Sequence, residues 1–318
     1  MRLFSYNQQK RMGSVEKTKK KTSAWKLGGL TIIQLAKRVW HEINHDEVFT
    51  RSAALSYYFF FALIPMVFFL MALLGMFASQ SEHLRAGLLN YFAQVMPGSA
   101  FTLVEKTLRE ISATSTGLKL IFGLVLSLWS VSGGMSSIMA ALNRCYHINE
   151  SRPYWKRRLV ALVLSIAMVA LTICALTMVL YGGDIAQWAG RHVGLSSVAV
   201  FAWKIVQWPI ALFFIMFAIA LIYYRGPNVK RDWAWITPGS LVGVTIWIGA
   251  SILFRVYLHF YNSYSKSYGS LGAVIVLLLW LYITGFAILA GGEINSEIEN
   301  AAAGRGHPEA KEAGEKVA

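Results

Sequence analysis

Long apolar segments without charge constrain the fold more than any other feature of the sequence. A helix needs about 20 apolar residues to cross the hydrocarbon core of a bilayer, and six segments meet this requirement. Charged residues make up 14% of the chain, compared with roughly 25% in soluble globular domains. We therefore expect an all-α polytopic membrane protein with six transmembrane helices. They cover approximately Ser52–Ala78, Leu118–Ala140, Leu159–Tyr181, Val198–Tyr224, Ala234–Leu258 and Leu271–Ile294.

The distribution of lysine and arginine predicts the orientation of these spans. The N-terminal arm, the loops 141–158 and 225–233 and the C-terminal tail hold 22 of these residues, whereas the other three loops hold 5. Positively charged segments stay in the cytoplasm, and an even number of spans places both termini on one side. We therefore expect cytoplasmic N- and C-termini.

Outside the spans, the sequence predicts two tails and one long loop. Residues 1–26 and 301–318 are expected to be disordered cytoplasmic tails on either side of a membrane domain at 50–300. We interpret the lysines of the N-terminal tail as contacts with the anionic membrane surface rather than with nucleic acid. The loop 79–116 is the long external segment, and it contains an amphipathic helical pattern.

Residues 27–49 form a further amphipathic segment before the first span. Their apolar side chains share one helical face, which indicates a helix lying along the inner membrane surface. The residues of this face are Ile32, Ala36, Val39, Trp40 and Ile43.

The second span contains the stretch LSLWSVSGGMSSIMAALNR, which has five serines and a pair of glycines. One interpretation is packing, because small residues let helices approach closely in lipid. Gly239 and Gly243 give the fifth span a similar pattern. The other interpretation is a substrate path, because hydroxyl groups and a weakened helix can border water inside the bilayer. The path candidates in the first two spans are Pro65, Ser130, Gly133, Gly134 and Ser137.

Charged and amide side chains near the span ends extend the path hypothesis. The candidates at the cytoplasmic end are Asn143, Arg144, Glu293 and Asn295. Glu293 has Arg51, Arg144 and Arg225 at the same depth as prospective partners. The candidates at the outer end are Lys119, Lys204 and Arg255. These cations either extend toward lipid phosphates or form a basic entrance for an anionic lipid or a small anion.

The segment WHEINHDE contains the H-E-x-x-H pattern of zinc metalloproteases, at His41, Glu42 and His45. In that pattern two histidines one helical turn apart bind zinc, and the glutamate activates water. The helical arrangement argues against such a site, because both histidines lie opposite the apolar face and point toward solvent. We therefore expect a solvated surface and no cofactor, and we keep a membrane metalloprotease as a third functional alternative.

Three segments carry distinctive motifs. They are RSAALSYYFFFALIPMVFFLMALLGMF (51–77), ALNRCYHINESRPYWKRR (141–158) and YNSYSKSYGSLGAVIVLLLWLYITGFAILAGGEINSEIE (261–299). They resemble the YihY/BrkB family of bacterial inner-membrane proteins, and the resemblance extends over about residues 35–300. It implies a multi-pass protein of the inner membrane. Members of the family have been called virulence factors, and some are implicated in the handling of envelope lipids or in solute movement.

The residues and the resemblance together define the functional hypotheses. The first is a transporter or lipid translocase whose partners are membrane lipids, and the second is a non-enzymatic scaffold of the cell envelope. The family has also carried the label ribonuclease BN. The sequence gives that activity no support, because neither an acidic or histidine cluster suited to phosphodiester cleavage nor an RNA-binding module is evident. We therefore expect neither enzymatic activity nor a nucleic-acid partner.

Overall fold

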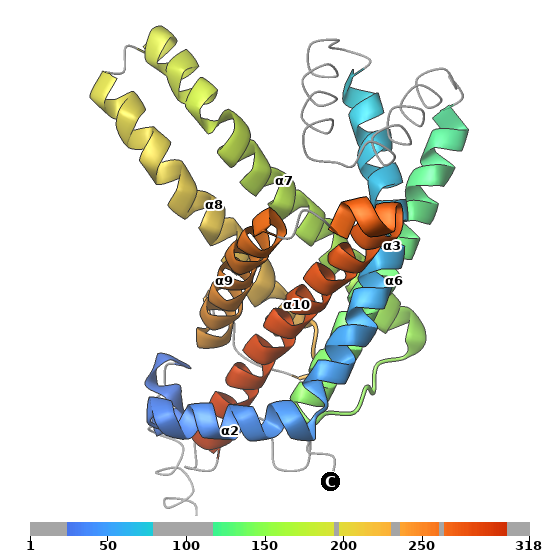
Figure 1. The fold of residues 1–318 in the computed structure, drawn as a ribbon, viewed down its shortest axis with the longest axis vertical. Helices are drawn as coiled ribbons and strands as arrows, with labels where there is room; N and C mark the ends of the chain where they lie inside the picture. The colour runs from blue at the N-terminus through green and yellow to red at the C-terminus, as the bar shows by residue number, and fades with distance from the viewer. Residues whose placement is uncertain (1–23, 79–116, 194–196, 230–235, 261–263, 304–318) are drawn as a thin grey trace, which may run out of the picture.

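The computed structural model describes residues 24–78, 117–193, 197–229, 236–260 and 264–303 (Figure 1). Every regular element in these ranges is a helix, and none of the ranges contains a strand. The predicted external loop 79–116 and most of both predicted tails lie outside the described residues. The all-helical prediction is therefore confirmed for the described part of the chain.

Among the described residues, five helices are long and apolar enough to cross a membrane. They are α6 (Gly117–Cys145), α7 (Tyr154–Val193), α8 (Ser197–Arg225), α9 (Pro238–Phe260) and α10 (Tyr264–Ala303). Each coincides with a predicted span, although α7 and α10 have 40 residues and extend well beyond the apolar segments. The first predicted span corresponds to α3 (Val48–Ala78), which has 31 residues and is helical on both sides of Pro65.

Two helical pairs and a central helix organise the membrane domain. α3 packs against α6, and α7 packs against α8. α10 lies between these pairs and contacts both α3 and α9. The two pairs diverge from one end of the molecule, so that α7 and α8 lean away from α3 and α6 (Figure 1).

α2 (Ile32–His45) runs across the end of the molecule at which α10 finishes (Figure 1). Its apolar residues divide between two faces. Leu35, Val39 and Ile43 are buried in the core, whereas Ile32 and Trp40 are 75% and 61% exposed. The structure therefore differs from the predicted single apolar face. Val39 and Ile43 of the predicted face pack on protein, whereas Ile32 and Trp40 stay exposed.

Glycine residues allow α9 and α10 to approach closely. A Cβ atom at Gly239 would overlap the Gly291 carbonyl, and one at Gly243 would lie 2.9 Å from the Ala287 carbonyl. The predicted close packing at Gly239 and Gly243 is therefore confirmed. The side-chain oxygen of Asn295 on α10 also accepts a 2.9 Å hydrogen bond from the N–H of Gly239, which satisfies a free donor in the first turn of α9.

Both described ends of the chain lie at the same end of the helix bundle. The short helix η1 (Ala24–Gly29) packs on the last turns of α10, where a Cβ at Gly28 would lie 2.5 Å from the Ile298 carbonyl. Gly28 also has a φ of 59°, which favours glycine. Residues 24–26 and 301–303, which the sequence places in the tails, are thus helical and belong to the packed structure.

Candidate functional site

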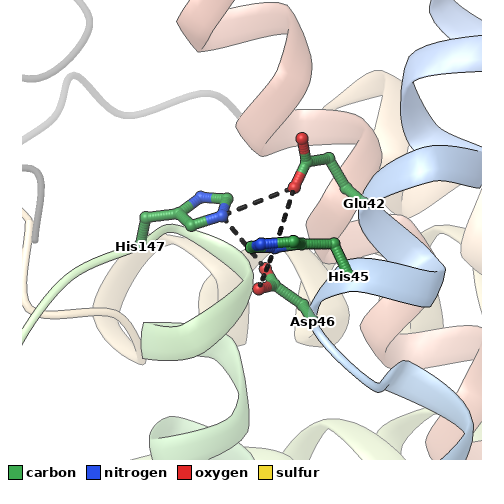
Figure 2. Close-up of side chains that lie close together, drawn as sticks. All are labelled: Glu42, His45, Asp46 and His147. Carbon is green, nitrogen blue, oxygen red and sulfur yellow. Dashed lines mark hydrogen bonds and ion pairs between the residues drawn. The ribbon is translucent and has the colours of Figure 1, made fainter. Parts of the chain in front are cut away.

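Four side chains from the end of α2 and from the turn after α6 form a compact cluster (Figure 2). They are Glu42, His45, Asp46 and His147. Oε2 of Glu42 lies 3.8 Å from Nδ1 of His45 and 3.4 Å from Nε2 of His147. The Asp46 carboxylate lies 3.3 Å from Nδ1 of His45 and 3.4 Å from Nε2 of His147. One nitrogen or oxygen atom from each residue lies within 4.8 Å of those of the other three.

The end of α6 directs the His147 ring toward α2. His147 has a φ of 52°, in the left-handed position after a helix where glycine is usual. Its N–H donates to the Arg144 carbonyl at 2.8 Å, and the N–H of Ile148 donates to the Asn143 carbonyl at 2.9 Å. This pair of bonds is the Schellman arrangement that ends many helices. A histidine in this left-handed conformation has a backbone free energy about 1 kcal/mol less favourable than that of glycine. The conformation places an imidazole ring at this point.

Asp46 forms the closed side of the cluster. Its side chain is completely buried, and its Oδ2 atom accepts no hydrogen bond from any described residue. Oδ1 lies 3.7 Å from Nε of Arg144. The side chain of His45, by contrast, is 59% exposed. The cluster is therefore sealed toward the helix bundle and open toward solvent.

The H-E-x-x-H pattern is not used as a zinc metalloprotease would use it. The His41 ring stacks beside that of His45, with 6.3 Å between the ring centres, but His41 is exposed and takes no part in the cluster. Glu42 and His45 instead lie beside Asp46 and His147. Because a metalloprotease needs both histidines as ligands and the glutamate as base, the geometry provides no support for this alternative. The predicted exposure of His41 and His45 is confirmed, although His45 also contacts the buried Asp46 carboxylate.

Glu293 lies close to the cluster, inside the bundle on α10. It is fully buried, and the Cys145 thiol, a weak donor, lies within hydrogen-bond reach of its carboxylate. Asp46, Glu42 and the Cys145 thiol are within electrostatic reach of it. The three arginines proposed as its partners are engaged elsewhere. Arg51 donates to the Asp46 carbonyl at 2.8 Å, Arg144 approaches Asp46, and Arg225 lies over the Tyr224 ring.

The serine-rich stretch of α6 satisfies its hydroxyl groups within its own helix. Four serines donate to carbonyls three or four residues earlier, at 2.7 to 3.1 Å: Ser130, Ser132, Ser136 and Ser137. Gly134 is buried, and a Cβ there would lie 3.6 Å from Ala62 on α3, whereas a Cβ at Gly133 would lie 3.7 Å from Arg158 on α7. The small residues thus face two neighbouring helices, which is the packing arrangement considered for this stretch.

Asn143 ties two loops together at the same end of the bundle. Its amide nitrogen donates to Oε2 of Glu150 at 2.9 Å, and its oxygen accepts the N–H of Asn228 at 2.8 Å. Arg152 pairs with Glu150 at 2.7 Å and donates to the Gly226 carbonyl at 2.8 Å. Burial alone would raise the pKa of the Glu150 carboxyl. Hydrogen bonds from Arg152 and Asn143 outweigh this effect and hold its pKa below the usual value.

The remaining predicted path residues belong to four different helices. Asn295 donates to the Thr237 hydroxyl at 3.0 Å in addition to holding the start of α9. Arg255 is exposed on α9, and the backbones of Lys119 and Lys204 belong to α6 and α8. The side chains of these two lysines lie outside the described placements. The roles assigned to these residues therefore stay predictions.

An apolar cavity of about 350 Å³ lies between the α7–α8 pair and α9–α10. Its lining consists of apolar side chains, with Gly243, Trp247 and two threonines as the exceptions. The hydroxyl of Thr284 donates to the Trp280 carbonyl at 2.9 Å and accepts from the Trp247 indole at 3.1 Å, so it is already satisfied. None of the lining residues is a predicted path residue. The cavity therefore borders the sixth predicted span through Thr284, Ala287 and Ile288 on α10, but it has no lining residue from the first or second span.

Sequence reasoning missed Asp46, His147 and Arg158. Asp46 directly follows the H-E-x-x-H pattern and ends α2, so a search for ligands beyond the pattern would have found it. Arg158 binds the carbonyl and ring of Trp129 and the hydroxyl of Ser136 across the α6–α7 contact. An arginine that ends a basic run, as Arg158 does after Lys156 and Arg157, resembles a snorkelling residue at the start of a span. The sequence has no signal that brings His147 to α2.

Comparisons with known proteins place the chain in a family. The model of the family described as Virulence factor BrkB matches residues 39–315. The putative ribonuclease-like protein YfkH of Bacillus subtilis (strain 168) is 32% identical over 260 residues, which are 82% of this chain and 93% of that protein. A UPF0761 membrane protein of Xanthomonas oryzae pv. oryzae (strain PXO99A) is 27% identical over 285 residues, 87% of this chain and 63% of that protein.

A third relative, the UPF0761 membrane protein Smlt0865 of Stenotrophomonas maltophilia (strain K279a), is 26% identical over 84% of this chain and 61% of its own length. The chain thus spans less than two thirds of these UPF0761 relatives. No solved structure matches the chain significantly. The family description and the UPF0761 names state no enzymatic activity, and the ribonuclease-like name is that of the Bacillus protein. Because the family model covers most of the sequence, this membrane protein belongs to the BrkB virulence factor family.

Proposed function

We propose that the protein is a lipid transporter or translocase of the bacterial inner membrane, with six spans and both termini in the cytoplasm. The apolar cavity between α7–α8 and α9–α10 carries this proposal. Cavities of roughly 300 Å³ or more are large enough to hold ligands. Hydrocarbon walls favour an acyl chain over a hydrated small anion, because the anion would lose its water without gaining polar partners.

The surroundings of the cavity support a lipid with an anionic headgroup. Ile222 lines the cavity near the end of α8, and Arg225 follows it by three residues, about 4.5 Å farther along the helix. Arg225 is exposed at this helix end. A lipid whose chain occupies the cavity would therefore place its phosphate near a guanidinium group at the membrane boundary.

Glu293 is the predicted path residue that we retain in this function. A buried carboxylate without a hydrogen-bond partner destabilises a protein, so such residues in membrane helices usually serve function. Among the described residues, Glu293 has only the weak thiol donor of Cys145 within hydrogen-bond reach, and Ile288, five residues earlier on α10, lines the cavity. We assign Glu293 to the conformational or ion-coupling step rather than to binding of the acyl chain.

Transport by the purified full-length protein in liposomes tests the proposal. Fluorescent anionic and zwitterionic phospholipids are incorporated, and chemical quenching from outside measures their movement between leaflets. Chloride and inorganic phosphate fluxes, measured in parallel, distinguish lipid transport from anion conduction. We expect lipid movement faster than in protein-free liposomes and no anion flux. Protein that moves no lipid would overturn the proposal and leave the envelope scaffold as the remaining interpretation.

Matched variants connect the activity to the structure. Ala175→Leu and Ala218→Leu add side-chain volume to the cavity wall, whereas Ala170→Leu adds the same volume at an exposed position of α7. We expect the first two to slow lipid movement and the third to leave it unchanged. Glu293→Gln should also slow movement, with the exposed Glu47→Gln as its control. Equal activity of all these variants would contradict the assignment of the cavity and of Glu293.

A further inference from the structure

We propose that Glu42, His45, Asp46 and His147 bind one divalent transition-metal ion of the zinc class. The site differs from the H-E-x-x-H pattern in two of its members, because it leaves out His41 and includes Asp46 and His147. It therefore combines the last turn of α2 with the turn after α6 (Figure 2). Two imidazoles and two carboxylates are ligands that zinc takes in proteins.

The spacing of the ligand atoms fits tetrahedral coordination. Bonds of about 2.0–2.1 Å from zinc to nitrogen or oxygen place tetrahedral ligand atoms about 3.3 Å apart. Oε2 of Glu42 lies 3.8 Å from His45 and 3.4 Å from His147, and the Asp46 carboxylate reaches His45 through Oδ1 at 3.3 Å and His147 through Oδ2 at 3.4 Å. The Nδ1 atom of His45 and the Nε2 atom of His147 are the ring nitrogens that face the carboxylates. One atom from each of the four residues lies within 4.8 Å of the others, so binding of an ion at the centre would draw these atoms together.

Asp46 provides an independent reason to expect a cation. Its side chain is completely buried, and Oδ2 points into the cluster without accepting a hydrogen bond from the described residues. Nε2 of His147 approaches Oδ2 at 3.4 Å without hydrogen-bond geometry, and leaving a buried polar atom without a hydrogen bond costs about 1–3 kcal/mol, more when the group is charged. A metal ion bound by this oxygen would remove that penalty. It would also offset the electrostatic repulsion between the Asp46 and Glu42 carboxylates.

The ligand types select the class of ion. Imidazole nitrogen suits zinc, copper, iron and nickel, whereas magnesium and calcium prefer shells made of oxygen atoms. Four protein ligands close the coordination sphere in the way that structural zinc sites do. The ion therefore joins α2 to the end of α6 and holds the surface helix on the membrane domain. The exposed side of His45 provides the route by which the ion enters.

Binding of zinc to the purified full-length protein tests this inference. The protein is prepared in detergent with a tag that lacks histidine, treated with a chelator, and titrated with Zn²⁺ against a chromophoric indicator. We expect saturation at one equivalent per chain and no competition from Mg²⁺ or Ca²⁺. Cobalt in place of zinc should give the visible absorption of a four-coordinate ion. Zinc should also raise the thermal unfolding temperature, because it binds the folded chain.

The variants distinguish this site from the metalloprotease pattern and from nonspecific binding. His147→Asn keeps a residue type that tolerates the positive φ, and His45→Gln keeps the length of an exposed side chain. Each should weaken zinc binding by more than about 100-fold, since even partners outside a coordination sphere cost about 10–100-fold. His41→Gln changes the neighbouring exposed histidine and should bind zinc as the wild type does. Absence of stoichiometric binding, or equal loss in His41→Gln, would overturn the inference.

Folding of each variant is checked by its elution profile and helical circular dichroism before the titration. If one ligand variant fails to fold, the other decides the outcome. None of these readouts depends on lipid movement. The metal site can therefore fail while the transport proposal stands, and the reverse also holds.

Discussion

The guanidinium carbon of Arg158 lies 4.5 Å from the centre of the Trp129 ring, so a cation–π contact joins α7 to α6. Arg158 also donates hydrogen bonds to the Trp129 carbonyl and to the Ser136 hydroxyl. The guanidinium lies beside Gly133, where a Cβ atom would be in ordinary contact with it at 3.7 Å. The serine-rich stretch therefore serves as the docking surface for a charged side chain of the next helix.

Replacement of Arg158 should loosen the contact between α6 and α7. Arg158→Ala removes the ring contact and the hydrogen bonds, and together these changes should lower the free energy of unfolding by about 1–3 kcal/mol. Thermal or denaturant unfolding in detergent measures the effect. Lys156→Ala, at an exposed position two residues earlier, is the control and should change stability little. Equal stability of both variants would show that the contact contributes nothing.

Removal of the Asn143 side chain should separate the two loops that it joins. Asn143→Ala leaves the backbone N–H of Asn228 and the Glu150 carboxylate without this partner. We expect a loss of about 1–3 kcal/mol in unfolding free energy, together with faster proteolysis of the loops. Asn149→Ala changes an exposed amide in the same loop and should behave like the wild type. Equal proteolysis rates would argue that other bonds hold the loops.

Acid should weaken the same loop contact through Glu150. Because its pKa is lowered in the folded protein from an ordinary value of 4.5, its stabilising effect is present above that value and is lost as the pH falls through the folded pKa. We expect Glu150→Gln to be less stable than the wild type near neutral pH, with the difference shrinking in acid. Unfolding measured over a pH series in detergent tests this. A difference that grows in acid would contradict the assigned direction.

Gly239 should be intolerant of any side chain. Gly239→Ala forces the first turn of α9 away from the Gly291 carbonyl and Asn295, and overpacking of this kind typically costs about 1–3 kcal/mol. Gly249→Ala is the matched control on the same helix, because a Cβ atom at Gly249 would have no neighbouring atom within 4 Å. Alanine also favours a helix over glycine by about 1 kcal/mol, so Gly249→Ala should be neutral or stabilising. Thermal unfolding of the two variants decides between these outcomes.

The helices could be predicted because the bilayer sets a length and excludes charge, so the described helices follow the apolar segments. Glycine spacing also predicted the α9–α10 contact at Gly239 and Gly243. The ends of α7 and α10 could not be predicted in this way, since helices continue outside lipid wherever their residues allow. Hydropathy gives no information on those extensions.

The candidate site was less predictable because its parts come from separate segments. His147 reaches Glu42 and Asp46 only when α6 and α2 end at the same place. A period of 3.6 residues could identify the apolar residues of α2, but it could not show that Val39 packs on protein while Trp40 stays exposed. The serines presented a similar ambiguity. Whether a hydroxyl faces water or its own helix depends on a rotamer that sequence does not specify.

A hydrogen-bond network fixes the ends of α6, α7 and α8 where the helical pairs converge. It is made by Asn143, Glu150, Arg152 and Asn228. Relative movement of the pairs would then be a rotation about that point. A small rotation there would displace the far ends of the helices by a larger distance. The displacement of a helix end for a given rotation grows with the length of the helix. The 40-residue α7 would sweep its far end through the widest arc while the hinge stays still.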